Sequence, residues 1–153
     1  ADNQYRWTLD RNWDETKYTL LVIMFNPSTA NGTTDDNTIK KLIKLAKYND
    51  AGGFTVCNLN PFCSKVPKKV EDMNAHTEEL NRKYITTMCK NCDMVVYAWG
   101  SIKIGKKKLP EEPLWLKQLV PNPYCFKLLK HNRPGHPLYL RIKTLLINYN
   151  TNS

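Results

Sequence analysis

The sequence contains no long apolar run, no internal repeat and no low-complexity tract. Its apolar stretches fall well short of the roughly 20 residues that a helix needs to span a bilayer, and residues 1–4 lack the basic and hydrophobic features of a secretory signal. With 153 residues, of which 41% are hydrophobic and 24% charged, the composition is that of an ordinary globular protein. We therefore expect a single domain over residues 1–153 that is soluble, cytoplasmic and monomeric.

Acidic residues are in short supply. The chain has 14 of them against 23 basic residues, which gives a formal net charge of +9. An excess of this size favours polyanionic partners, nucleic acid first, although it speaks to association and not to the fold.

The number of cysteines is odd. Five cysteines cannot all pair, so we expect reduced thiols and not a disulfide framework. Cys89 and Cys92 have the spacing of a metal-binding pair, but no second pair and no nearby histidine completes a ligand set. Zinc or an iron–sulfur cluster is the disfavoured alternative, and we predict neither a metal nor another cofactor.

The apolar run 20–25 organises the rest of the chain. Large and branched residues in an unbroken run are typical of a strand that is buried on both faces. Asn26-Pro27 ends it, because proline fixes its own φ and removes a donor. Residues 54–59 repeat the device before Asn60-Pro61. Two parallel, buried strands are therefore expected here.

The remaining elements alternate along the chain. Further strands are expected over 93–100 and 124–129, with an edge or hairpin strand at 5–9. Apolar residues at helical spacing predict helices around 39–46 and 80–88, the second with Leu80, Tyr84, Ile85 and Met88 inward, and a short helix over 113–120. This order predicts an α/β fold, a three-layer sandwich with a short, mainly parallel central sheet.

Polar residues follow the strands of this predicted sheet. If the strands are parallel, their carboxyl ends bring together Asn26, Asn58, Trp99-Gly100 and the loop 131–140. Ligands bind at this edge in open α/β sheets. In the loop, His136-Pro137 again holds a polar side chain before a proline, and a histidine can donate or accept near neutral pH. Taken singly, Asn26 could be a structural turn and His136 a satisfied loop histidine; together with Asn58 and Trp99 they favour a site.

Five short motifs occur in a telling order: Asn-Pro-Ser-Thr-Ala at 26–30, Asp-Asp before a helix, Asn-Leu at 58–59, Trp-Gly at 99–100 and His-Pro-Leu-Tyr-Leu at 136–140. This set resembles a bacterial and phage domain family that carries no functional name. That domain in turn resembles the uracil-DNA glycosylase superfamily, and the match covers most of the chain in the same order. The fold is then expected to be uracil-DNA-glycosylase-like, and the activity to be removal of a base from DNA.

The resemblance implies roles for particular residues. Asn26 would position the attacking water, Asn58 would read the base edge, and His136 would hold the base oxygen. Met24 stands where these enzymes have a motif glycine, and it should crowd the pocket floor and change which base fits. The other base-binding candidates are Phe25, Ser28 and Trp99.

DNA contacts follow from the same resemblance and from the charge. Trp99-Gly100-Ser101 is similar to a phosphate-contacting turn, and Leu138 and Tyr139 would intercalate, although Leu138 replaces a serine. Basic loop residues could track phosphates, with a plain solvated surface as the alternative. The DNA-binding candidates are Gly100, Ser101, Lys65, Lys103, Lys106, Lys107, Leu138, Tyr139 and Arg141.

The chemistry limits what these residues can do. An asparagine amide has no useful basicity, so Asn26 can only orient water, and His136 is the candidate for stabilising the departing base. Asp35 or Asp36 could supply the missing carboxylate, although helix capping is the favoured interpretation of that pair. Trp7, Trp13 and Trp115 are expected to pack and not to stack on bases.

These observations predict a DNA glycosylase that flips a base out of double-stranded DNA and excises it. A modified pyrimidine is the favoured substrate. Action on phage DNA in defence is a further hypothesis. The alternative is a non-catalytic nucleotide or nucleic-acid binding module that uses the same pocket, consistent with the missing motif carboxylate. A third is an interaction protein whose basic face binds a partner.

Overall fold

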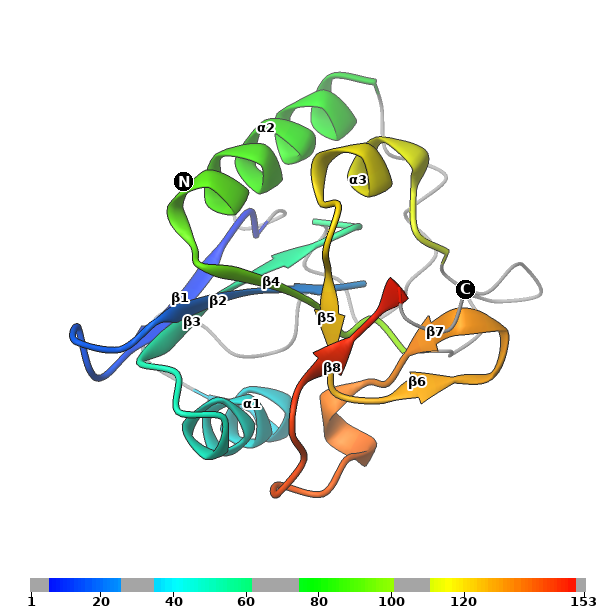
Figure 1. The fold of residues 1–153 in the computed structure, drawn as a ribbon. Coiled ribbons are helices and arrows are strands. Elements are labelled where there is room, and N and C mark those ends of the chain that lie inside the picture. The colour runs from blue at the N-terminus through cyan, green and yellow to red at the C-terminus, as the bar shows by residue number, and fades with distance from the viewer. Residues whose placement is uncertain (1–5, 26–34, 62–74, 101–110, 151–153) are drawn as a thin grey trace.

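The computed structural model describes residues 6–25, 35–61, 75–100 and 111–150. Within them, six strands form one sheet in the order β1-β3-β2-β4-β5-β8 (Figure 1). The inner pairs β3/β2, β2/β4 and β4/β5 are parallel, whereas the edge strands β1 and β8 run antiparallel to β3 and β5. The bounds are β1 Leu9–Asn12, β2 Thr19–Met24, β3 Gly53–Asn58, β4 Met94–Tyr97, β5 Tyr124–Cys125 and β8 Ile147–Asn148.

An α/β fold is thus confirmed, but the sheet is mixed and the expectation of a mainly parallel sheet is wrong. The reason lies at the edges, where a short strand has one partner and leaves only a weak sequence pattern. β8 is exposed and was not predicted. β1 starts at Leu9, at the end of the expected range 5–9. It is an edge strand, one of the two predicted alternatives, and it pairs with β3 instead of forming a hairpin with β2. Antiparallel edge strands on an otherwise parallel sheet are common in such folds.

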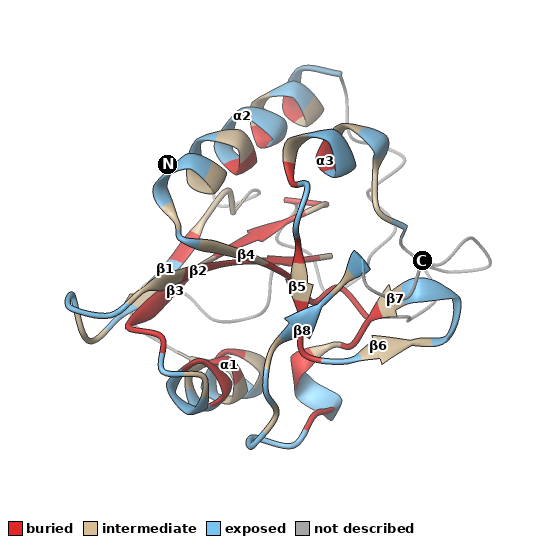
Figure 2. Ribbon diagram, viewed as in Figure 1, coloured by how far each residue is buried: buried red, intermediate tan, exposed pale blue. Residues whose placement is uncertain are grey.

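Helices cover both faces of the sheet. α1 (Asn37–Tyr48) lies on one face, and α2 (Ala75–Asn91) and α3 (Leu114–Leu119) lie on the other (Figure 1). Because side chains alternate along a strand, β2 serves both layers: Leu20, Val22 and Met24 pack with α1, whereas Leu21 and Ile23 pack on the α2 and α3 side. Figure 2 shows β2 and β3 buried along most of their length. Each fully buried aliphatic side chain stabilises the fold by about 1.5–3 kcal/mol.

The expected fourth strand, 124–129, is divided. β5 ends at Cys125, and β6 (Leu128–Leu129) turns away to pair with β7 (Arg133–Pro134) in a separate two-stranded sheet. Phe126 explains the break, because it is 2% exposed in the core on the α1 side and the backbone turns to place it there. The 3₁₀ helices η2 (Lys130–Asn132) and η3 (Pro137–Tyr139) complete this region.

α2 was predicted as a helix, but its buried face was not. Of the expected inward residues, only Ile85 is buried, and Tyr84 is exposed; the other buried positions are Thr77 and Asn81. The spacing of four residues puts Thr77, Asn81 and Ile85 on one face of the helix. Asn81 is polar there because its Nδ2 donates to the backbone oxygen of Asn58 at 2.8 Å, and a buried carbonyl needs such a donor.

Candidate functional site

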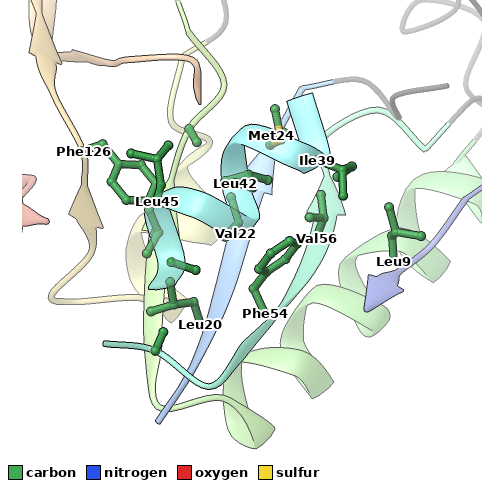
Figure 3. Packing of buried hydrophobic residues seen from close by; sticks show 14 of the residues in the cluster. Leu9, Leu20, Val22, Met24, Ile39, Leu42, Leu45, Phe54, Val56 and Phe126 are labelled. Atoms are coloured by element: carbon green, nitrogen blue, oxygen red, sulfur yellow. The ribbon is translucent and has the colours of Figure 1, made fainter. Parts of the chain in front are cut away.

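The carboxyl ends of β2, β3 and β4 form one edge of the sheet. Met24, the last residue of β2, is in register with Asn58, the last of β3. On the other side, the Ala98 amide donates to the Ile23 oxygen at 2.8 Å and carries β4 to the same level. Met24 itself is 4% exposed and packs with Ile39 of α1 (Figure 3). Its side chain therefore belongs to the core that lies below this edge.

Asn58 is the most unusual residue at this edge. Its side chain is completely buried, yet neither Oδ1 nor Nδ2 has a hydrogen-bond partner among the described residues. Its position in register with Met24 places it on the α1 side of the sheet. A buried amide left unpaired costs about 1–3 kcal/mol, and such a group calls for an explanation in function or in a bound ligand. Its Nδ2 and Oδ1 are thus a donor and an acceptor that no described residue uses.

His136 stands immediately before η3 and is half-buried. The Leu138 amide donates to His136 Nδ1 at 3.1 Å, so Nδ1 carries no proton and a neutral ring has its hydrogen on Nε2. Burial lowers the pKa of His136, and the Asp36 carboxylate opposes that shift only in part. The ring is therefore a neutral donor through Nε2 near pH 7.

Gly100 is what lets His136 come this close to the end of β4. It has a left-handed φ of 78°, and its amide donates to the Pro134 oxygen at 2.9 Å. A Cβ at position 100 would lie 2.9 Å from the Cβ of His136, closer than real contacts allow. Only glycine meets both demands without strain. A cavity of about 110 Å³ lies beside the pair, lined by Gly100, His136, Tyr139 and neighbouring residues.

The two aspartates before α1 are already engaged. Asp36 is the N-cap, and its Oδ1 accepts from the Ile39 amide at 2.9 Å. Asp35 forms an ion pair of 2.6 Å with Arg11 on β1. Capping, the favoured interpretation, is thus what Asp36 does, while its carboxylate also acts electrostatically on His136.

The sheet separates the predicted residues into two groups. Trp99 and Phe25 lie on the α2 and α3 side, opposite Asn58 and Met24. Trp99 is 2% exposed and packs against Tyr97, with 4.5 Å between the two ring centroids. Its Nε1 has no hydrogen-bond partner in the described part of the chain. The rim beside His136 is open: Leu138 and Tyr139 are 40% and 71% exposed, and Arg141 is exposed as well.

The sequence model of one family, described as a protein of unknown function (DUF1643), matches residues 6–138. The chain belongs to the DUF1643 family. The matched range includes all three strand ends, His136 and the start of η3. No match is found among curated proteins or among solved structures. The resemblance to uracil-DNA glycosylases therefore stays a prediction for this DUF1643 member.

Several predicted site residues lie outside the described residues. These are Asn26, Ser28, Lys65, Ser101, Lys103, Lys106 and Lys107.

The sequence analysis missed Asn81, which is 3% exposed and contacts the end of β3 from α2. The available signal was its position, four residues before the buried Ile85 on the same helix face.

The cysteines in the described residues, Cys57, Cys89, Cys92 and Cys125, are free thiols. Burial raises the pKa of Cys89 to about 11 and also raises the pKa of Cys92, so both stay protonated and are poor ligands and nucleophiles. Within the described ranges, no group of three or more His, Cys, Asp or Glu side chains is arranged to hold a metal ion. Among the same residues, no helix is both long and apolar enough to cross a membrane.

Proposed function

We propose that this protein is a DNA glycosylase with a uracil-DNA-glycosylase-like, three-layer fold. It excises a base from double-stranded DNA, and a modified pyrimidine is the favoured substrate. The observation that carries the proposal is the buried, unpartnered amide of Asn58 at the carboxyl edge of the sheet. An amide presents a donor and an acceptor side by side, which is the pattern that a base edge can satisfy. Any other ligand at this edge would also need to present a hydrogen-bond donor and an acceptor side by side.

His136 supplies the second element of the proposal. Cleavage of an N-glycosidic bond leaves negative charge on the departing base and positive charge on the sugar. The neutral imidazole, held with Nδ1 as an acceptor from Leu138, can donate from Nε2 to a base oxygen where that charge develops. A preorganised donor of this kind is worth about 10²–10³ in rate. Asn26, through its amide, would then orient the attacking water.

The surroundings suit a DNA substrate. The base must leave the stack to reach such a site, and the exposed side chains of Leu138 and Tyr139 stand next to His136, with 5.9 Å between the Tyr139 and His136 ring centroids. They are the proposed wedge. The net charge of +9 favours the phosphate backbone, with Arg141 and the basic loops as the proposed contacts.

One observation favours the second candidate, a binding module without chemistry. Asp35 and Asp36, the carboxylates considered for activating water, are both in use, Asp36 as the cap of α1 and Asp35 in the ion pair with Arg11. In that case Asn58 and His136 would hold a base or nucleotide and release no product.

The test is release of free bases, followed by mass spectrometry, from duplexes that contain uracil, mismatched thymine, or hydroxymethylated or glucosylated pyrimidines, the last two as found in modified phage DNA. We expect one base to be released, with a rate about 10²–10³ lower for His136→Ala, loss of release for Asn58→Ala, and no change for His76→Ala, an exposed histidine of α2. Salt-sensitive binding without release would support the binding module. If the protein neither binds these duplexes nor releases a base from them, both proposals are overturned.

A further inference from the structure

A second hollow lies between α2 and α3, on the face of the sheet opposite Asn58. Its volume is about 620 Å³, within the 300–1,000 Å³ that is typical of small-molecule sites. Phe25 and Leu59, just beyond the ends of β2 and β3, supply apolar surface, and the two helices supply the walls. Figure 1 shows α2 and α3 next to each other over this face. Of the base-binding candidates named from the sequence, Phe25 lies at this hollow and on the opposite face of the sheet from Asn58.

Asn81 places a buried polar atom at this hollow. The residue is 3% exposed and lines the hollow. Its Nδ2 donates to the backbone oxygens of Asn58 at 2.8 Å and Leu59 at 3.4 Å. Two carbonyls on one side fix the amide orientation, because only the nitrogen can donate to them. Oδ1 is therefore turned away from the strand ends and has no partner among the described residues. Asn81 thus brings to the wall of the hollow a buried acceptor that no described residue uses.

The opposite wall is aromatic and is held in place by charge. The Arg82 guanidinium lies over the Trp115 ring, 5.1 Å from its centroid, and donates to Glu78 at 3.0 Å. Arg82 is thereby committed to two protein partners. Phe25 and Trp115 both line the hollow, so part of its apolar surface comes from two aromatic side chains.

The charge at the hollow differs from that of the whole chain. Among the described residues that line it, Glu78 and Glu111 are acidic and Arg82 is basic, although the protein has a net charge of +9. Glu111 is exposed, and its contact with Arg133, at 3.6 Å, is long. Arg82 is already paired with Glu78, so it offers a phosphate no free positive charge. The hollow is therefore suited to a neutral or cationic molecule.

We propose that this α2–α3 pocket binds a flat, phosphate-free heteroaromatic molecule that carries an amino group, of the chemical class of an aminopurine or aminopyrimidine base or its nucleoside. The amino group donates to Asn81 Oδ1, and the ring lies against the apolar surface of Phe25 and Trp115. Specificity for an amino group follows because a buried acceptor that is left unpaired penalises a ligand without the donor. The proposal goes beyond the glycosylase function and does not depend on it.

The test is calorimetric titration of the intact protein with adenosine and cytidine, with ¹⁵N chemical-shift mapping to locate the site. Purine riboside lacks the amino group of adenosine, and AMP adds a phosphate. We expect adenosine or cytidine to bind. Purine riboside should bind more weakly than adenosine by roughly tenfold or more, and AMP should also bind more weakly than adenosine. Trp115→Ala and Asn81→Leu should each weaken binding by about tenfold or more, whereas Lys117→Ala, an exposed α3 neighbour outside the pocket, should not.

The proposal is overturned if the folded wild-type protein binds no amino compound, if purine riboside binds equally well, or if Trp115→Ala leaves the affinity unchanged. Asn81→Leu can disturb the end of β3, so Trp115→Ala, on the half-exposed wall, is the deciding variant. His136→Ala separates the two sites. If it abolishes nucleoside binding, the ligand occupies the first site and the α2–α3 pocket is refuted. Base release from DNA is measured separately, so either proposal can fail alone.

Discussion

Replacing Asn58 by leucine should stabilise the protein. The substitution keeps the branch at Cγ and replaces the two amide atoms, neither of which has a partner among the described residues, with methyl groups. Asn58 is fully buried, so the folded state now carries the desolvation of an amide without its hydrogen bonds. Leucine removes that cost and adds apolar burial.

The magnitude follows from the buried amide. An unsatisfied buried polar group costs about 1–3 kcal/mol, and some of this gain is offset because leucine must fit a closely packed site. We expect the free energy of unfolding to rise by about 1–2 kcal/mol, which for a chain of this length raises the melting temperature by roughly 2–8 °C. The same variant should lose base binding, because leucine offers no hydrogen bond.

The assay is urea unfolding followed by circular dichroism, with Asn49→Leu as the matched control. Asn49 Nδ2 donates to Leu45 and Thr144 oxygens at 2.9 and 2.8 Å, and its Oδ1 accepts from the Leu146 amide at 2.8 Å. With three bonds at roughly 1 kcal/mol each, its loss should destabilise by about 2–4 kcal/mol. If Asn58→Leu were destabilising to a similar degree, the amide would have partners in the folded protein, and the observation behind the proposed function would be gone.

Three further changes test the surroundings of His136. Asp36→Ala should cost about 0.5–2 kcal/mol through loss of the α1 cap and should lower the pKa of His136 further in an NMR titration; an unchanged pKa would contradict the Asp36 contact. Gly100→Ala should cost about 1–2 kcal/mol or more, because φ is 78° and the new Cβ meets His136; a neutral effect in urea unfolding would refute that close approach. Since burial lowers the pKa of His136, the unfolded state binds its proton more readily, so its contribution to stability is complete above about pH 6.5 and falls as the pH drops toward the folded pKa. His136→Gln should flatten that part of the stability profile, and an identical profile would show that another group titrates.

Local patterns predicted the elements whose signal is complete within a few residues. The run 20–25 became β2, the pattern before Asn60-Pro61 became β3, and Asp36 capped α1. These succeed because burial on both faces, a proline stop and a side-chain cap are decided by neighbours in sequence. The prediction that His136 lies close to Gly100 is also confirmed, although the chain reaches His136 through β6, η2 and β7 and not directly from the end of a parallel strand.

The failures come from contacts between distant segments. The inward face of α2 is polar at Asn81 because the backbone at the end of β3 needs a donor, which apolar periodicity does not register. The α2–α3 pocket likewise depends on how two helices meet over the strand ends. The separation of Trp99 from Asn58 across the sheet required knowing which residues alternate to which face.

The unpartnered state of Asn58 follows from how the end of β3 is satisfied. The Leu59 and Asn60 amides donate to the Met24 and Phe25 oxygens at 2.9 and 2.8 Å, which extends the ladder past both strands, and Asn81 donates to the Asn58 backbone oxygen from the other face. Because these backbone groups already have partners, the Asn58 side chain is not needed to form hydrogen bonds with them. Its desolvation is already complete in the unliganded protein, so a base that supplies a donor and an acceptor gains hydrogen bonds without a further cost there. The stability gained by Asn58→Leu, about 1–2 kcal/mol, and the affinity lost by it should therefore be of similar size.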